Sequence, residues 1–173
     1  TIDDISVAVR VESSLVERPS LLAPLVAAAG ALLLVVGVIG RTSAALQRLM
    51  VAASLVGLVI GGAQYLWAAP GTGPQLTSFA LPLLATMLSG SAIVFNRTSS
   101  IQRNGVQLIS SIFLALWVLR RKDVLDAALL PTSLPYWVDR AGTAAIGVIV
   151  CATAGDALVG LWQIANAIRP SPR

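Results

Sequence analysis

The chain has no histidine and a single cysteine, Cys151, among its 173 residues. Zinc, copper, haem and iron–sulfur sites draw most of their ligands from these two residue types. A Ser-His-Asp or Cys-His catalytic system also requires a histidine. A lone cysteine cannot form an intrachain disulfide. We therefore expect a protein with no metal, no cofactor and no catalytic residues of its own.

Charged residues are scarce as well, at 12% of the chain, whereas soluble domains carry about 25%. Apolar residues make up 56% and gather in long uninterrupted runs. A helix needs about 20 apolar residues to cross a hydrocarbon core of about 30 Å. A soluble bundle with these runs would have too little polar surface to cover its core. The composition predicts an all-α integral membrane protein that crosses the bilayer several times.

Five apolar runs are candidate transmembrane helices, at 21–40, 50–69, 76–95, 104–119 and 141–161. The fourth run is the shortest, because only 16 residues separate Arg103 from Arg120, which is about 24 Å of helix. Arginine side chains that reach the interface, or a locally thinner bilayer, would close this gap. If the fourth run instead lies in the interface, the chain has four spans.

The runs divide the chain into four parts. We expect segment 1–18 to form an amphipathic interfacial helix or a flexible tail. Segment 19–69 should form a first hairpin from spans one and two. Segment 70–130 should form a second hairpin from spans three and four, followed by a surface segment. Segment 131–173 holds the fifth span and a basic tail.

A short polar motif occurs twice, as RTSAALQR at 41–48 and as RTSSIQR at 97–103. Each copy lies between two apolar runs, at the same place in the two expected hairpins. The repeat therefore predicts a duplicated helical hairpin whose two turns carry the motif. Within the second copy, Ser99 and Gln102 have the spacing of a capping box, so a helix should begin beside them.

In the five-span arrangement, the two motif turns face a surface without acidic residues. The acidic residues outside the spans fall on the opposite side, with the N-terminus: Asp3, Asp4, Glu12, Glu17, Asp123, Asp126 and Asp139. Basic residues divide evenly between the two sides, so the positive-inside rule does not orient the chain. Anionic lipid favours a cytoplasmic, matrix or stromal position for the cationic surface. The hypothesis is an energy-transducing or bacterial inner membrane.

Aromatic residues support the same arrangement. Five of them fall where spans two, four and five reach the acidic side: Tyr65, Trp67, Trp117, Tyr136 and Trp137. Tryptophan and tyrosine are enriched at the boundary between lipid and water. These positions therefore predict an aromatic belt on the acidic side of the membrane.

Asp156 is the one carboxylate inside an apolar run. An ionisable group inside a bilayer is costly, which makes Asp156 a candidate ion or proton site. The alternative is a structural pairing with an arginine of a neighbouring subunit. Gln64 and Gln163 are candidates to share a polar seam with Asp156, unless they simply lie at the ends of their spans.

Small residues four positions apart occur in three of the runs, as the pairs Gly57 and Gly61, Thr86 and Gly90, and Cys151 and Gly155. Such pairs allow the backbones of two helices to approach closely in lipid. They either dock partner helices or pack the bundle itself.

The arginines of the repeated motif are the candidate surface site: Arg41, Arg48, Arg97 and Arg103. They either anchor the hairpins among lipid headgroups or bind an anionic lipid or an acidic partner. The net charge of +4 comes from arginines that flank apolar runs. Phosphate headgroups are therefore the expected partner, and nucleic acid is not.

These features favour a non-catalytic integral membrane subunit of a larger complex. Such a subunit would support or tether other integral membrane proteins and contact lipid. The alternative hypothesis is a small ion or solute transporter or channel that uses Asp156.

Overall fold

A computed structural model describes residues 20–39, 43–67, 76–94, 99–126 and 135–168. The described residues form six helices and no strand, which confirms the all-α prediction. In chain order the helices are α1 (Leu22–Ile39), α2 (Ser43–Leu66), α3 (Leu76–Val94), α4 (Ser100–Arg120), α5 (Lys122–Asp126) and α6 (Tyr136–Ile168). The expected N-terminal segment 1–18 and most of the C-terminal tail lie outside the described residues.

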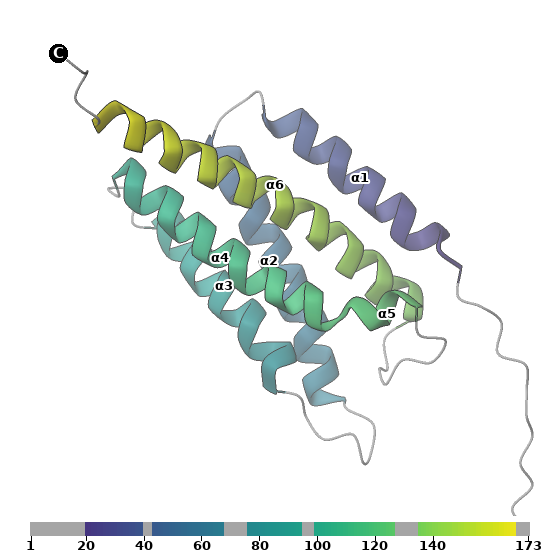
Figure 1. The fold of residues 1–173 in the computed structure, drawn as a ribbon. Helices are drawn as coiled ribbons and strands as arrows, with labels where there is room; N and C mark the ends of the chain where they lie inside the picture. The colour runs from purple at the N-terminus through teal and green to yellow at the C-terminus, as the bar shows by residue number, and fades with distance from the viewer. Residues whose placement is uncertain (1–19, 40–42, 68–75, 95–98, 127–134, 169–173) are drawn as a thin grey trace, which may run out of the picture.

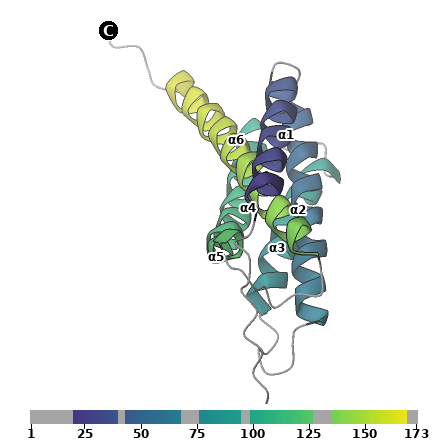
Figure 2. The same cartoon turned by 90° about the vertical axis from the view of Figure 1, so that its right-hand side faces the viewer.

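The longest helix, α6, joins the parts of the bundle (Figure 1). It packs against α1 on one side and α4 on the other, and it also touches α2. The helices α2, α3 and α4 pack against one another in chain order. Figure 2 shows that α6 crosses α1 and α2 obliquely. The short α5 lies beside α6, where the Arg140 Nε donates a hydrogen bond to the carbonyl oxygen of Val124 at 3.2 Å.

The two expected hairpins are packed differently. The helices α3 and α4 lie against each other, whereas α1 rests mainly on α6 and meets α2 at few positions. The duplication of the hairpin therefore stays a prediction from the repeated motif.

Several helices extend beyond the apolar runs that predicted them. The second apolar run begins at residue 50, but α2 begins at Ser43. The helix α4 begins at Ser100, beside the predicted capping box and before its apolar run at 104. Arg48 and Arg103 therefore lie inside helices and not in turns. The physical reason is that alanine, leucine, glutamine and arginine are good helix formers whether or not they are in lipid. The helix α6 has 33 residues, about 50 Å of helix, and it extends past both ends of the apolar run at 141–161.

A capping box begins α4, as the spacing of Ser99 and Gln102 predicted. The Ser99 hydroxyl accepts a hydrogen bond from the Gln102 backbone N–H at 3.3 Å. The Gln102 side-chain oxygen accepts one from the Ser99 backbone N–H at 3.1 Å. Two backbone donors are satisfied in this way, which fixes the start of α4.

The core lies where α2, α3, α4 and α6 meet. Its largest fully buried side chains are Trp117, Met50, Leu114 and Ile146. Pro82 is buried in the middle of α3. The carbonyl oxygen of Pro82 accepts a hydrogen bond from the Thr86 hydroxyl at 2.8 Å. This bond satisfies the polar hydroxyl of Thr86 inside the apolar helix.

The outer surface of the described bundle is strongly apolar. On α1 alone, large apolar side chains are exposed at Leu22, Leu25, Val26, Leu32, Leu33, Leu34 and Val36. Three helical segments are long and apolar enough to cross a membrane, Ala44–Leu66, Leu76–Val94 and Tyr136–Ile168. The apolar part of α1, Leu22–Val38, is somewhat shorter. These helices fit a multi-pass membrane protein.

Candidate functional site

Asp156 lies on the outward face of α6 and its side chain is exposed. Its carboxylate accepts a hydrogen bond from the Gln107 side-chain nitrogen, at 3.4 Å, across the α4–α6 contact. The same nitrogen donates to the Thr153 carbonyl oxygen at 3.1 Å. Gln107 itself is buried, so Asp156 sits at the outer end of a polar contact that reaches into the bundle.

The other two residues predicted to join Asp156 lie elsewhere. Gln163 is exposed on α6, two turns beyond Asp156, which is about 10 Å along the helix axis. Gln64 lies in the last turns of α2 and its side-chain nitrogen donates a hydrogen bond to Asp139 at 2.8 Å. The structure therefore does not bring the three residues into one site, and it assigns Gln64 to a different cluster.

That cluster is a buried ion pair between Arg121 and Asp139, whose side chains are 6% and 0% exposed. Arg121 caps the C-terminus of α4, and Asp139 lies in the first turn of α6. A carboxylate at a helix N-terminus is favoured by the helix dipole. The Gln64 side-chain oxygen also accepts a hydrogen bond from Arg121. Three helices are thus joined at one end of the bundle.

Two further residues surround the ion pair. The Thr143 hydroxyl donates to the Asp139 backbone carbonyl at 2.9 Å and lies 3.5 Å from the Arg121 Nε. The Arg121 guanidinium lies 4.5 Å from the centre of the Trp117 ring, a cation–π distance. Burial lowers the pKa of Arg121, and Asp139 opposes that shift. Arginine remains protonated near neutral pH, so the cluster holds a charged pair.

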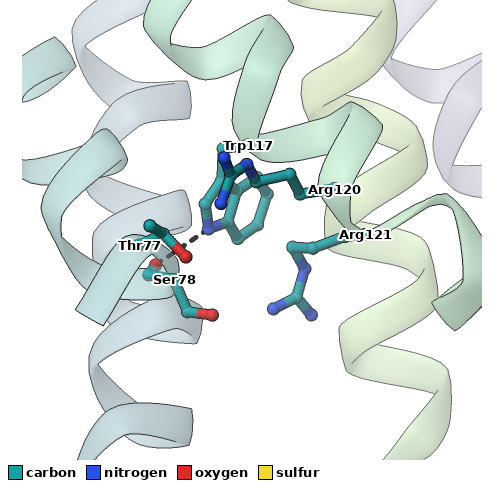
Figure 3. Close-up of a pocket in the computed structure, with 5 residues that line it drawn as sticks. All are labelled: Thr77, Ser78, Trp117, Arg120 and Arg121. Atoms are coloured by element: carbon teal, nitrogen blue, oxygen red, sulfur yellow. Dashed lines mark hydrogen bonds between the residues drawn. The ribbon is translucent and has the colours of Figure 1, made fainter. Parts of the chain in front are cut away.

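Trp117 connects this cluster to α3. Its side chain is 1% exposed, and its indole N–H donates a hydrogen bond to the Ser78 carbonyl oxygen at 2.9 Å. Figure 3 shows this bond, with Arg120 and Arg121 on the same end of α4. All four long helices α2, α3, α4 and α6 are therefore tied together at the Arg121–Asp139 end.

This ion pair was not predicted, because Arg121 and Asp139 lie in the sequence between the expected fourth and fifth spans. One signal for it was present. Trp117 and Arg121 are four residues apart, which is the spacing that brings a cation over an aromatic ring on one helix face. The pairing with Asp139 and Gln64 depends on tertiary packing and has no local signal.

A second polar layer crosses the middle of the bundle. The Ser111 and Thr153 hydroxyl oxygens are 3.0 Å apart, and those of Ser54 and Ser89 are 3.4 Å apart. In the part of the chain that the structure describes, the buried Ser110 hydroxyl has no hydrogen-bond partner.

An apolar layer separates this middle layer from the ion pair. Leu114 and Ile146 are completely or almost completely buried between them. Thr143 and Thr153 belong to the two polar layers and are ten residues apart on α6, about 15 Å. The described residues therefore do not form a continuous polar path along the bundle.

The predicted small-residue pairs fall into two groups. Gly57 and Gly61 are buried between α2 and its neighbours, and a methyl group added at Gly61 would overlap the carbonyl oxygen of Ser78. Cys151 and Gly155 are exposed on α6, and a methyl group at Gly155 would meet nothing within 4 Å.

The pair in α3 is intermediate between these groups. Thr86 and Gly90 are half-buried, and a methyl group added at Gly90 would also meet nothing within 4 Å. Only the α2 pair therefore shows the close backbone approach that small residues allow.

Among the predicted surface arginines, Arg48 is exposed on α2 and Arg103 is half-buried on α4. The Arg103 Nε is buried and has no hydrogen-bond partner among the described residues. Arg41 and Arg97 lie outside the described residues.

The described residues contain no group of three or more histidine, cysteine, aspartate or glutamate side chains placed to hold a metal ion. Comparison of the chain with protein families, with curated proteins and with solved structures finds no match. The function is therefore argued from the geometry of this chain alone.

Proposed function

We propose that this protein is a non-catalytic, multi-pass membrane subunit that docks through the outward face of α6 onto another integral membrane protein. The observation that carries the proposal is the exposed carboxylate of Asp156 on a largely apolar helix surface. In this role the bundle supports or tethers its neighbours, and it performs no chemistry itself.

The helix lengths support five spans. At about 1.5 Å per residue, α1 measures about 27 Å, α2 about 36 Å, α3 about 28 Å and α4 about 31 Å. These lengths are close to the thickness of a hydrocarbon core, about 30 Å. The longer α6 crosses with a tilt or projects beyond the bilayer. Two hairpins followed by a single span put the chain ends on opposite sides.

The exposed apolar surface supports a membrane location. A soluble monomer rarely exposes one contiguous apolar patch larger than a few hundred Å². Here the exposed faces of α1 and α6 are both apolar, with Leu33 and Trp162 among their most exposed side chains. Trp67 and Trp137 are exposed at the end of the bundle that holds the ion pair, where an aromatic belt would lie.

The position of Asp156 supports a partner helix. One turn further along α6, the exposed Val159 lies on the same side as Asp156, so the carboxylate borders a surface suited to lipid tails. A charged side chain that faces hydrocarbon costs several kcal/mol, and one hydrogen bond from Gln107 compensates little of that. A polar or cationic group on a second protein would replace the hydrogen bonds to water that Asp156 loses in the membrane.

Exposed small residues lie about 100° to 140° around the α6 axis from Asp156, and they support docking on the exposed side of this helix. Cys151 and Gly155 leave a shallow strip along α6, one turn apart. A second helix can approach its backbone there, as small residues allow in membrane proteins. On the other side of the membrane from the acidic residues, Arg48 and the other motif arginines would contact anionic headgroups.

We expect Gly155→Leu to reduce recovery of the partner protein about tenfold when the tagged protein is isolated from its own membrane in mild detergent. A leucine on this strip keeps the second helix at a distance, and a loss of 1.4 kcal/mol is tenfold in binding. The matched control is Gly30→Leu, because Gly30 is also exposed with nothing within 4 Å, but on α1. Equal recovery from both variants would rule out the α6 face as the docking surface.

Transport remains the second candidate function, and one observation favours it. Polar contacts lead from the surface to the centre of the bundle. Gln107 donates to Asp156 and to the Thr153 carbonyl oxygen, and the Thr153 hydroxyl contacts Ser111. The apolar layer of Leu114 and Ile146 interrupts these contacts before the ion pair. A transporter would have to open that layer, which is why we place this function second.

A further inference from the structure

A cavity of about 210 Å³ lies at the end of the bundle that holds the ion pair. Its lining consists of Thr77, Ser78, Trp117, Arg120 and Arg121. Figure 3 shows these side chains gathered between the start of α3 and the end of α4. Drug-sized ligands occupy pockets of about 300–1,000 Å³, so this cavity suits a smaller group.

The walls of the cavity are held in place by the contacts described above. The Trp117 indole is fixed by its hydrogen bond to the Ser78 carbonyl oxygen at 2.9 Å. Arg121 is fixed by Asp139 and Gln64 and lies against the Trp117 ring. Because these side chains are already ordered, less conformational entropy is lost when a ligand binds.

The cavity carries a positive charge that no described residue neutralises. Asp139 balances the charge of Arg121. The neighbouring α5 contains one lysine and two aspartates, Lys122, Asp123 and Asp126. Arg120 is exposed and has no ion-pair or hydrogen-bond partner among the described residues. The lining thus offers one free guanidinium, together with the hydroxyl groups of Thr77 and Ser78.

This set of groups matches a phosphate. Guanidinium groups bind phosphate oxygens through paired, charge-assisted hydrogen bonds, and hydroxyl groups donate to the remaining oxygens. The cavity lies at the same height along the bundle as the exposed Trp67 and Trp137. Trp67 is within one helical turn of Gln64, and Trp137 is within one turn of Asp139, to which Gln64 is hydrogen-bonded. In a membrane, that level is the headgroup region.

We propose that this cavity binds the phosphate of an anionic phospholipid headgroup, with Arg120 as its main cationic contact. The site lies at the opposite end of the bundle from Arg48 and Arg103. The inference depends on the membrane location in the proposed function, but not on the existence of a partner subunit. A protein that is isolated without a partner but still binds the lipid would contradict only the proposed function.

The test measures binding of short-chain phosphatidylglycerol, short-chain phosphatidylcholine and inorganic phosphate to the full chain in detergent. We expect phosphatidylglycerol to bind, and Arg120→Gln to weaken its binding about tenfold, the effect of one lost charge-assisted hydrogen bond. Lys122→Gln is the matched control, since it removes one exposed positive charge two residues away and should change the affinity less than about twofold. Ser78→Ala should weaken binding as well, without touching any charge.

Three results would overturn the proposal. Equal losses in Arg120→Gln and Lys122→Gln would mean that the lipid responds to surface charge alone. Equal affinity for phosphatidylcholine and phosphatidylglycerol would contradict recognition of an anionic headgroup. Tight binding of inorganic phosphate without any binding of phosphatidylglycerol would assign the cavity to a soluble phosphate and exclude the lipid. The unfolding temperature of each variant shows that the bundle is intact.

Discussion

Replacing Asp139 with asparagine is expected to destabilise the bundle by about 3–5 kcal/mol, because it leaves the Arg121 guanidinium buried without a counter-charge. Asp139 is completely buried and Arg121 almost so, and little solvent reaches the pair to compensate. The same change weakens the hydrogen bond from Gln64. The effect should be seen as a fall in the midpoint of denaturant unfolding in detergent.

Two further variants test whether the loss of stability comes from the buried ion pair. Asp123→Asn removes a carboxylate from the exposed surface of α5 and should change stability by no more than about 0.5 kcal/mol. The double variant Arg121→Met with Asp139→Leu should recover much of the loss, because apolar residues of similar volume often replace a buried ion pair without cost. If Asp139→Asn and Asp123→Asn unfold alike, the buried ion pair does not hold the helices together.

Gly61→Ala should destabilise the protein by about 3 kcal/mol. A methyl group at this position would overlap the Ser78 carbonyl oxygen, which already accepts the hydrogen bond from Trp117. Overpacking of a core costs about 1–3 kcal/mol, and a broken buried hydrogen bond adds about 1–3 kcal/mol. The higher helix propensity of alanine offsets only about 1 kcal/mol of this loss in stability.

The matched substitution is Gly155→Ala on α6. A methyl group there meets nothing within 4 Å, so the isolated protein should gain up to about 1 kcal/mol from helix propensity. Opposite signs for the two substitutions, measured by the same unfolding experiment, are the expected outcome. A small effect of the same sign at both positions would contradict the close approach of α2 and α3 at Gly61.

The helical architecture could be predicted from the sequence because it rests on local information. Long apolar runs located α1 and α3 almost to the residue, and the spacing of Ser99 and Gln102 located the start of α4. The ends of α2 and α6 could not be located from apolar runs. Polar residues that are good helix formers continue a helix past the hydrocarbon region, and the pattern of apolar residues does not record this.

The candidate site was less predictable because its contacts are long-range. Gln64 and Asp139 are 75 residues apart in the chain, and they meet only when α2 and α6 pack. The side of α6 on which Asp156 lies could not be predicted either. The residues of α6 are apolar on nearly every face, so no amphipathic pattern says which side turns outward. The residue types were therefore informative, but their grouping depended on tertiary packing.

The most direct test of the central claim is native mass spectrometry of the protein extracted from its own membrane in mild detergent. We expect a mass equal to this chain plus at least one other integral membrane protein, and we expect Gly155→Leu to release the chain from that assembly. A lone monomer in the wild-type sample would contradict the subunit function and leave transport as the stronger candidate.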